Sequence, residues 1–81
     1  MQIQITAEHI KNGRAKDAEH CPIALALKSL GWEKAAVGAT IISLSRAGEA
    51  KYLKHSQQSL IFMKHFDKGL TVIPMELKIL E

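Results

Sequence analysis

The chain has 81 residues, of which 47% are hydrophobic and 23% charged, and its net charge is +3 at pH 7. This length predicts one small domain over residues 1–81 and excludes a two-domain enzyme, because a single domain commonly takes about 100 to 200 residues. The composition indicates a folded chain rather than a disordered or membrane-spanning one. A domain this small buries about 60% of its unfolded surface, so a homodimer would add stability.

The first elements predicted along the chain are a strand and a short helical turn. Polar and apolar residues alternate over 2–6, which is typical of a strand with one buried face. Thr6 is suited to cap a helical turn over 7–11, and Asn12-Gly13 is suited to end it, because these residue types adopt the backbone conformations found at helix ends.

A longer helix is predicted from Pro22 to Gly31. Proline fits the first helical position, where its missing N–H would have no partner, and glycine is a common residue just after a helix. Asp17 or Cys21 is the predicted N-cap. The apolar face, which predicts that this helix is mostly buried, contains Ile23, Ala24, Leu27 and Leu30.

Strands are predicted in the middle of the chain. Residues 35–45 are rich in β-branched side chains and are interrupted by Gly38, which fits either a hairpin or one bent strand. Residues 46–50 are typical of a turn. Residues 51–54 are predicted to form a short edge strand, whose lysines disfavour pairing with other chains.

A second long helix and a final strand complete the chain. Ser56 is the predicted cap of a helix over 57–67, and Gly69 ends it. Pro74 precedes residues 75–80, where apolar and polar side chains alternate as in a strand with one face inward. The helix has a broad apolar stripe that we expect to face the core, made of Leu60, Ile61, Phe62, Met63 and Phe66.

These elements predict an α+β fold in the order β-α-α-β-β-α-β. Short amphipathic strands favour an antiparallel sheet with helices packed on one face. An all-parallel sheet would need continuous apolar strands and longer crossovers than this chain provides.

Several motifs resemble those of a small, functionally uncharacterised phage and prophage protein family. The motifs are Ala7-Glu8-His9-Ile10, the run Cys21-Pro22-Ile23-Ala24-Leu25-Ala26-Leu27, Phe66-Asp67-x-Gly69, and Pro74 before the last strand. The run that begins at Cys21 is the specific part. The resemblance covers most of the chain and implies a phage setting, without an activity or functional residues.

Enzyme activity is not expected from this sequence. Cys21 lies at a predicted helix N-terminus, a position that lowers the pKa of a thiol. Catalysis would also need a general base, and the adjacent His20 is expected to point away from Cys21. We therefore expect a packed, structural thiol. The histidines and Cys21 lack the short spacings of zinc ligands, and no phosphate-binding loop or serine-hydrolase motif occurs, so no cofactor is expected.

The single cysteine excludes an internal disulfide and, without a recognisable leader segment, favours a cytoplasmic location. The positive charge is concentrated between residues 46 and 68. This region has five basic and two acidic residues, so its net charge is +3, the same as that of the whole chain. This region is a candidate surface for DNA or RNA, with Tyr52 stacking on a base. Its basic residues are Arg46, Lys51, Lys54, Lys64 and Lys68.

A second hypothesis concerns a small anion. Arg14 and Lys16, together with the helix N-terminus at Cys21, are candidates to bind the phosphate of a signalling nucleotide, which the chain would sequester.

The interpretation ranked first is a non-enzymatic, phage-type accessory protein that binds and inhibits a host protein, for example one in an antiviral defence pathway. Trp32 and Tyr52 are the candidate aromatic anchors, because aromatic residues contribute strongly at interfaces. Arg46, Lys51 and Lys54 are the candidate polar contacts beside them. Trp32 directly follows the helix-ending Gly31, so local packing is its alternative role.

Overall fold

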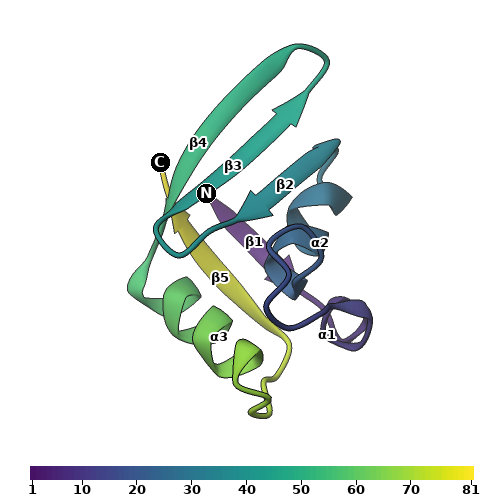
Figure 1. The fold of residues 1–81 in the computed structure, drawn as a ribbon, viewed down its shortest axis with the longest axis vertical. Helices are drawn as coiled ribbons and strands as arrows, with labels where there is room; N and C mark the ends of the chain where they lie inside the picture. Colours follow the sequence, from purple (N-terminus) through teal and green to yellow (C-terminus); the bar gives the residue numbers. More distant parts are fainter.

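The computed structural model describes residues 1–81 and has the predicted α+β fold (Figure 1). The segment predicted as a hairpin or a bent strand forms a hairpin, in which β2 and β3 pair antiparallel. The elements are β1 (Gln2–Ile5), α1 (Ala7–Asn12), α2 (Pro22–Ser29), β2 (Lys34–Val37), β3 (Ile41–Arg46), β4 (Glu49–His55), α3 (Gln57–Asp67) and β5 (Met75–Leu80).

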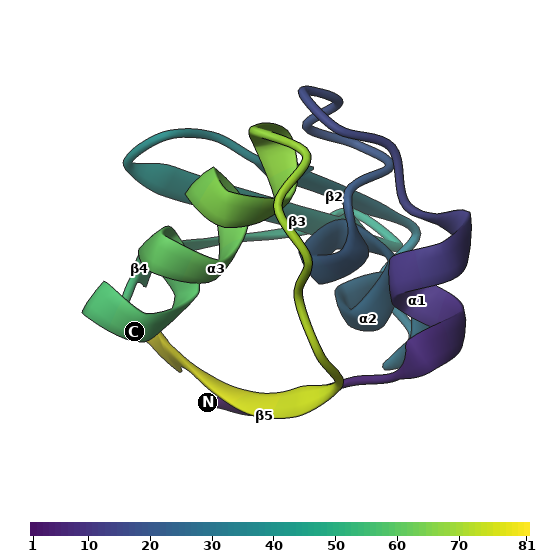
Figure 2. The same cartoon turned by 90° about the horizontal axis from the view of Figure 1, so that it is seen from below.

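The five strands form one antiparallel sheet in the order β1-β5-β4-β3-β2. Although β1 and β2 are the two ends of this order, α2 contacts both of them. The sheet is therefore curled around α2, and the view from below shows the strands bent around the helices (Figure 2). α3 covers β4 and β5, and α1 packs against α2.

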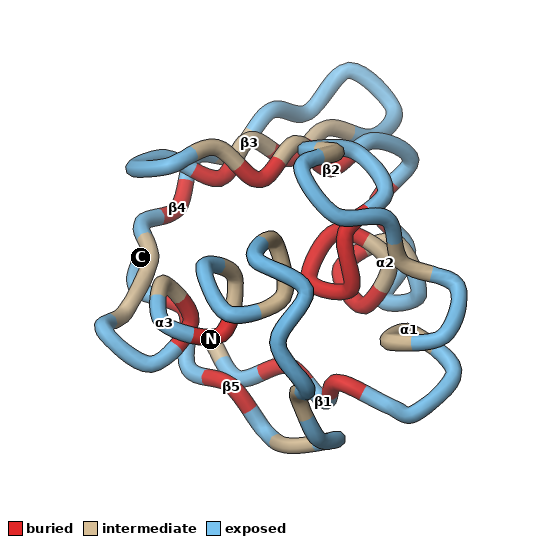
Figure 3. The backbone as a smooth tube through the Cα atoms, turned by 60° about the horizontal axis from the view of Figure 1, so that its bottom comes forward, coloured by how far each residue is buried: buried red, intermediate tan, exposed pale blue.

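The core lies between the inner face of the curled sheet and the helices. It contains 16 buried residues, many of them alternate residues of the strands (Figure 3). Strand alternation places side chains two residues apart on the same face, so one face of each strand is buried. The large side chains of the strands that are fully buried are those of Ile3, Ile5, Ile42, Leu53, Leu77 and Ile79.

The predicted helix ends are confirmed. The side chains of Thr6, Cys21 and Ser56 each accept a backbone N–H of the first turn that follows. Gly31 and Gly69 come just after α2 and α3 with φ of 105° and 79°, a left-handed conformation that glycine adopts without steric cost.

The short edge strand predicted over 51–54 is longer and has a different position. Only Ala47 and Gly48 form the turn, both with positive φ, so β4 begins at Glu49 and lies between β3 and β5. Its pairing with β5 is limited to Lys54 with Leu80 and to the following residue of β4 with Ile79. Residues 49–53 of β4 therefore extend beyond the end of β5.

Candidate binding groove

An open groove lies between α3 and residues 71–75, and we refer to it as the α3 groove. Its volume is about 620 Å³, and ligand sites commonly have about 300–1,000 Å³. The side chains of Ile61 and Ile73 are 47% and 62% exposed there, although both are large and apolar. The lining residues are Gln57, Gln58, Ile61, Phe62, His65, Thr71, Val72, Ile73 and Met75.

α3 has more apolar side chains than the sheet buries. Its buried residues are Ser59 and Phe62, whereas Ile61 is exposed, so the prediction that the whole stripe faces the core is wrong. The reason is that α2 fills the space between β1 and β2, so α3 packs mainly against β4 and β5. The remaining apolar residues, Leu60, Met63 and Phe66, are half-buried.

The connector that forms the other wall is extended and has no backbone partner (Figure 2). No hydrogen bond in the structure uses the N–H or C=O groups of Thr71, Val72 or Ile73. These three residues are β-branched and favour strand conformations. Further along the chain, the backbone N–H of Lys78 donates to Oε1 of Gln58 at 3.3 Å, so a side-chain amide replaces a neighbouring strand at this edge of β5.

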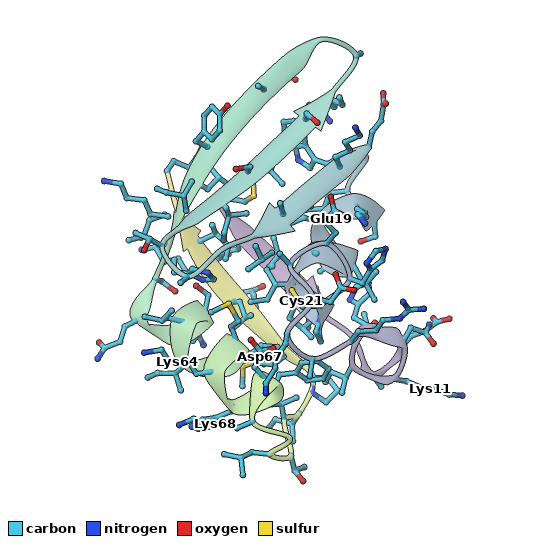
Figure 4. The ribbon with its side chains drawn as sticks, viewed as in Figure 1. Lys11, Glu19, Cys21, Lys64, Asp67 and Lys68 are labelled. Carbon is cyan, nitrogen blue, oxygen red and sulfur yellow. The ribbon has the colours of Figure 1, made fainter.

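Two charged residues on the same side of α3 as the groove residue Ile61 are positive. Lys64 and Lys68 continue the row that begins at Ile61, at spacings of three and seven residues, which share one side of a helix. They project from α3 away from Asp67 (Figure 4). The Asp67 carboxylate accepts the backbone N–H of Lys16 at 2.9 Å instead. None of the residues that line the groove is acidic.

Two of the residues predicted to bind a partner, Trp32 and Arg46, contact each other outside the groove. The guanidinium carbon of Arg46 lies 4.1 Å from the centroid of the Trp32 ring, a cation–π arrangement. Arg46 also donates from Nε to the Glu49 carboxylate at 3.2 Å. Because Trp32 is only 7% exposed, its position matches the packing role that was its alternative.

The other three candidates lie on β4. Tyr52 is 67% exposed and, like Lys54, alternates with the buried Leu53, so both side chains lie on the outer face of the sheet. Lys51 donates from Nζ to Glu81 at 2.8 Å. This hydrogen bond and the charge of Lys51 lower the pKa of the Glu81 carboxyl.

The basic residues between 46 and 68 are not gathered on one surface. Arg46 lies next to the β3–β4 turn, at one end of the longest axis of the molecule, and Lys68 lies at the end of α3, near the other end (Figure 1). Arg46 and Lys51 are also engaged in ion pairs with acidic side chains. The structure thus brings together Lys64 and Lys68 but not the five residues considered as a nucleic-acid surface.

Cys21 is buried at the start of α2, where its Sγ accepts a backbone N–H at 3.5 Å. Burial raises the pKa of the thiol, the opposite of the direction expected for a helix N-terminus. A cavity of about 200 Å³ beside it is lined by Lys16 but also by Asp17 and Asp67, and Figure 4 shows Cys21 close to Asp67. Arg14 is exposed and does not line this cavity, so the three candidate anion ligands are not assembled.

His55 and Ser59 form a hydrogen-bonded pair that sequence reasoning did not identify. His55 Nδ1 lies 2.9 Å from Ser59 Oγ, and His55 Nε2 lies 2.8 Å from the carbonyl oxygen of Gly38. A carbonyl only accepts, so Nε2 donates to Gly38, and the Ser59 hydroxyl lies within hydrogen-bond distance of both Nδ1 and the carbonyl oxygen of Ser56. Ser59 is completely buried, which keeps its oxygen from any substrate.

The α3 groove itself was also missed by sequence reasoning. The available signal was an apolar stripe five residues wide on a helix of 11 residues, followed by Leu70, Val72 and Ile73 outside any predicted element. Apolar residues in excess of what a small core can bury indicate a binding surface.

Three findings concern the chain as a whole. None of its helices is long and apolar enough to cross a bilayer. No group of three or more His, Cys, Asp or Glu side chains is placed to hold a metal ion. The chain matches no protein-family model, no curated protein and no solved structure.

Proposed function

We propose that this chain is a non-enzymatic protein-binding module that holds a segment of another protein in the α3 groove. The observation that carries the proposal is the exposure of Ile61 and Ile73 on the two walls of one apolar groove. Burying such side chains contributes about 25 cal/mol per Å² of apolar surface, so a partner that covers both walls gains binding free energy.

The biological role that we attach to this binding is inhibition of a host protein. The resemblance to small phage and prophage proteins supports a partner from the host cell, in the cytoplasm. A module of this size inhibits by occupying a segment that its target needs for another contact, without any chemical step. The dispersed basic residues and the acidic side chains next to Cys21 give less support to a nucleic-acid ligand or a sequestered nucleotide.

Site-specific photo-crosslinking tests the proposal. Ile61 is replaced by a photoreactive phenylalanine derivative, and a matched variant has the same replacement at Ile41, which is 39% exposed on the opposite face of the sheet. We expect a host protein to be crosslinked from position 61 and not from position 41. The purified partner should then bind the unmodified chain and lose affinity for the I73E variant. Equal crosslinking from both positions, or unchanged affinity of I73E, would overturn the proposal.

A further inference from the structure

We infer that the α3 groove takes its partner as an extended strand, in which apolar side chains alternate with acidic ones, and that this strand pairs with the backbone of residues 71–73. The inference rests on the proposed function and specifies the chemistry of the partner. It combines three observations: a connector without backbone partners, an apolar groove beside it, and positive charge on the neighbouring helix.

The unpaired backbone of the connector favours a partner that binds as a strand over one that binds as a helix. A bound helix satisfies its own backbone groups, so it would take water away from Thr71, Val72 and Ile73 without giving their N–H and C=O groups a partner. A bound strand supplies those hydrogen bonds, as in modules that bind an extended peptide along an exposed backbone edge. Pro74 has no N–H and therefore limits the ladder at this end.

The apolar side chains of the groove favour a partner strand in which every second residue is apolar. A strand directs every second side chain to the same face, so one set of partner residues faces Ile61, Phe62 and Val72. These groove residues are apolar and so match apolar partner residues. The structure already shows how such an edge is satisfied, because Gln58 accepts from the N–H of Lys78 where a strand is missing.

The positive charges of Lys64 and Lys68 favour acidic residues at the alternate positions of the partner strand. Lys64 and Lys68 share one side of α3 with the groove residue Ile61, and no acidic residue lines the groove. The nearest carboxylate on the same helix, Asp67, lies on the other side and is bonded to the backbone of Lys16. Acidic residues in the partner would thus face two unpaired lysines, which steers association and disfavours basic segments.

Selection from random peptides tests the inference with the full chain as bait. Peptides of about nine residues, long enough to span about 30 Å as a strand, are displayed on phage and selected against the protein. We expect enriched peptides to alternate Asp or Glu with Val, Ile, Leu or Phe. Synthetic versions should shift the amide NMR signals of Thr71, Val72 and Ile73. In the synthetic peptides, methylation of every second backbone nitrogen should weaken binding by about tenfold or more, because it removes the hydrogen bonds between the two strands.

Variants assign the binding to the groove. I73E should weaken binding of the enriched peptides by about tenfold or more, whereas I41E, the same change on the outer face of the sheet, should leave it unchanged. A K64Q/K68Q double variant should bind more weakly and with less dependence on salt, because screening acts on the ion pairs it removes. Both altered lysines are exposed, so the variant is expected to fold.

Other results overturn the inference in distinguishable ways. The enriched peptides could have apolar residues at every third or fourth position and lose their binding to I73E. This result would show that the partner binds as a helix, and the proposed function would still stand. Basic peptides would contradict the charge argument. A dimer of the chain that I73E dissociates would identify a second copy as the occupant. Selection of no peptide that depends on Ile73 would overturn both this inference and the proposed function.

Discussion

His55 binds the β2–β3 turn to the start of α3, because its ring lies between the carbonyl oxygen of Gly38 and the hydroxyl of Ser59, at 2.8 and 2.9 Å. Since His55 is the last residue of β4, this one side chain connects a strand, a turn and a helix. The contact is a structural counterpart of the Ser–His pairs found in enzymes, with the hydroxyl fully buried.

The first prediction concerns this contact. H55A should lower the free energy of unfolding by about 1–3 kcal/mol, because it leaves a carbonyl and a buried hydroxyl with fewer partners. Chemical denaturation measures the change, and H65A is the matched control, since His65 is exposed and its side chain makes no hydrogen bond in the structure. Equal stability of H55A and H65A would contradict the structural role.

The second prediction concerns Trp32 and Arg46. W32A should lower the free energy of unfolding by about 3–5 kcal/mol, the usual cost of removing a buried aromatic side chain. R46Q should leave the chain folded but make Trp32, the only tryptophan, more accessible to acrylamide quenching. K34Q is the control on the neighbouring strand. A W32A chain as stable as the original would instead favour the contact role considered from the sequence.

The third prediction concerns the reactivity of Cys21. Burial raises the pKa of its thiol, so the reactive thiolate is scarce at neutral pH. We expect a disulfide reagent to modify the folded chain at least about tenfold more slowly than the denatured chain. Rapid modification at pH 7 would show that the thiol is exposed and activated.

The raised pKa of Cys21 also predicts a dependence of stability on pH. A thiol whose pKa is higher in the folded chain than in the unfolded chain binds its proton more tightly when folded. Its contribution to stability is therefore complete below the unfolded value, about 8.5, and is lost as the pH rises through the folded value. The C21A variant should lose less stability than the original chain between neutral and alkaline pH, as measured by denaturation. An identical pH profile would contradict the shift.

The fifth prediction concerns the β3–β4 turn. Ala47 has φ of 43°, a left-handed conformation that costs an ordinary residue about 1–2 kcal/mol. Asn tolerates it better, and Asn-Gly is the preferred pair in two-residue hairpin turns, so A47N should raise the free energy of unfolding by about 0.5–1 kcal/mol. A39N, at an exposed residue whose φ is not positive, is the control. A47N that is no more stable than A39N would contradict this conformation.

Local features of the fold could be predicted from the sequence because they depend on neighbouring residues. Ser56 caps α3 through the N–H of Ser59, three residues later, and Gly69 ends the same helix through its own backbone conformation. The inward faces of the strands follow from alternation alone, as Leu77 and Ile79 show. The α+β class follows from these elements and from the length of the chain.

Features that depend on distant residues could not be predicted in this way. The central position of β4 requires the pairing of Lys54 with Leu80, which a local pattern does not encode. The exposure of Ile61 depends on how much of the concave face α2 occupies. The α3 groove depends in the same way on two segments that are separate in the sequence, α3 and residues 71–75. No single sequence motif therefore predicts it.

The contact of α2 with both β1 and β2 has a consequence for synthesis of the chain. β1 pairs only with β5, and Ile3 lies opposite Leu77, 74 residues later. Until the last strand leaves the ribosome, the nascent chain can form the β2–β3–β4 meander, but Ile3 and Ile5 have no partner strand to cover them. β5 must therefore be synthesised before this fold can close, and a ribosome that stalls before β5 would present an incomplete sheet to chaperones and proteases.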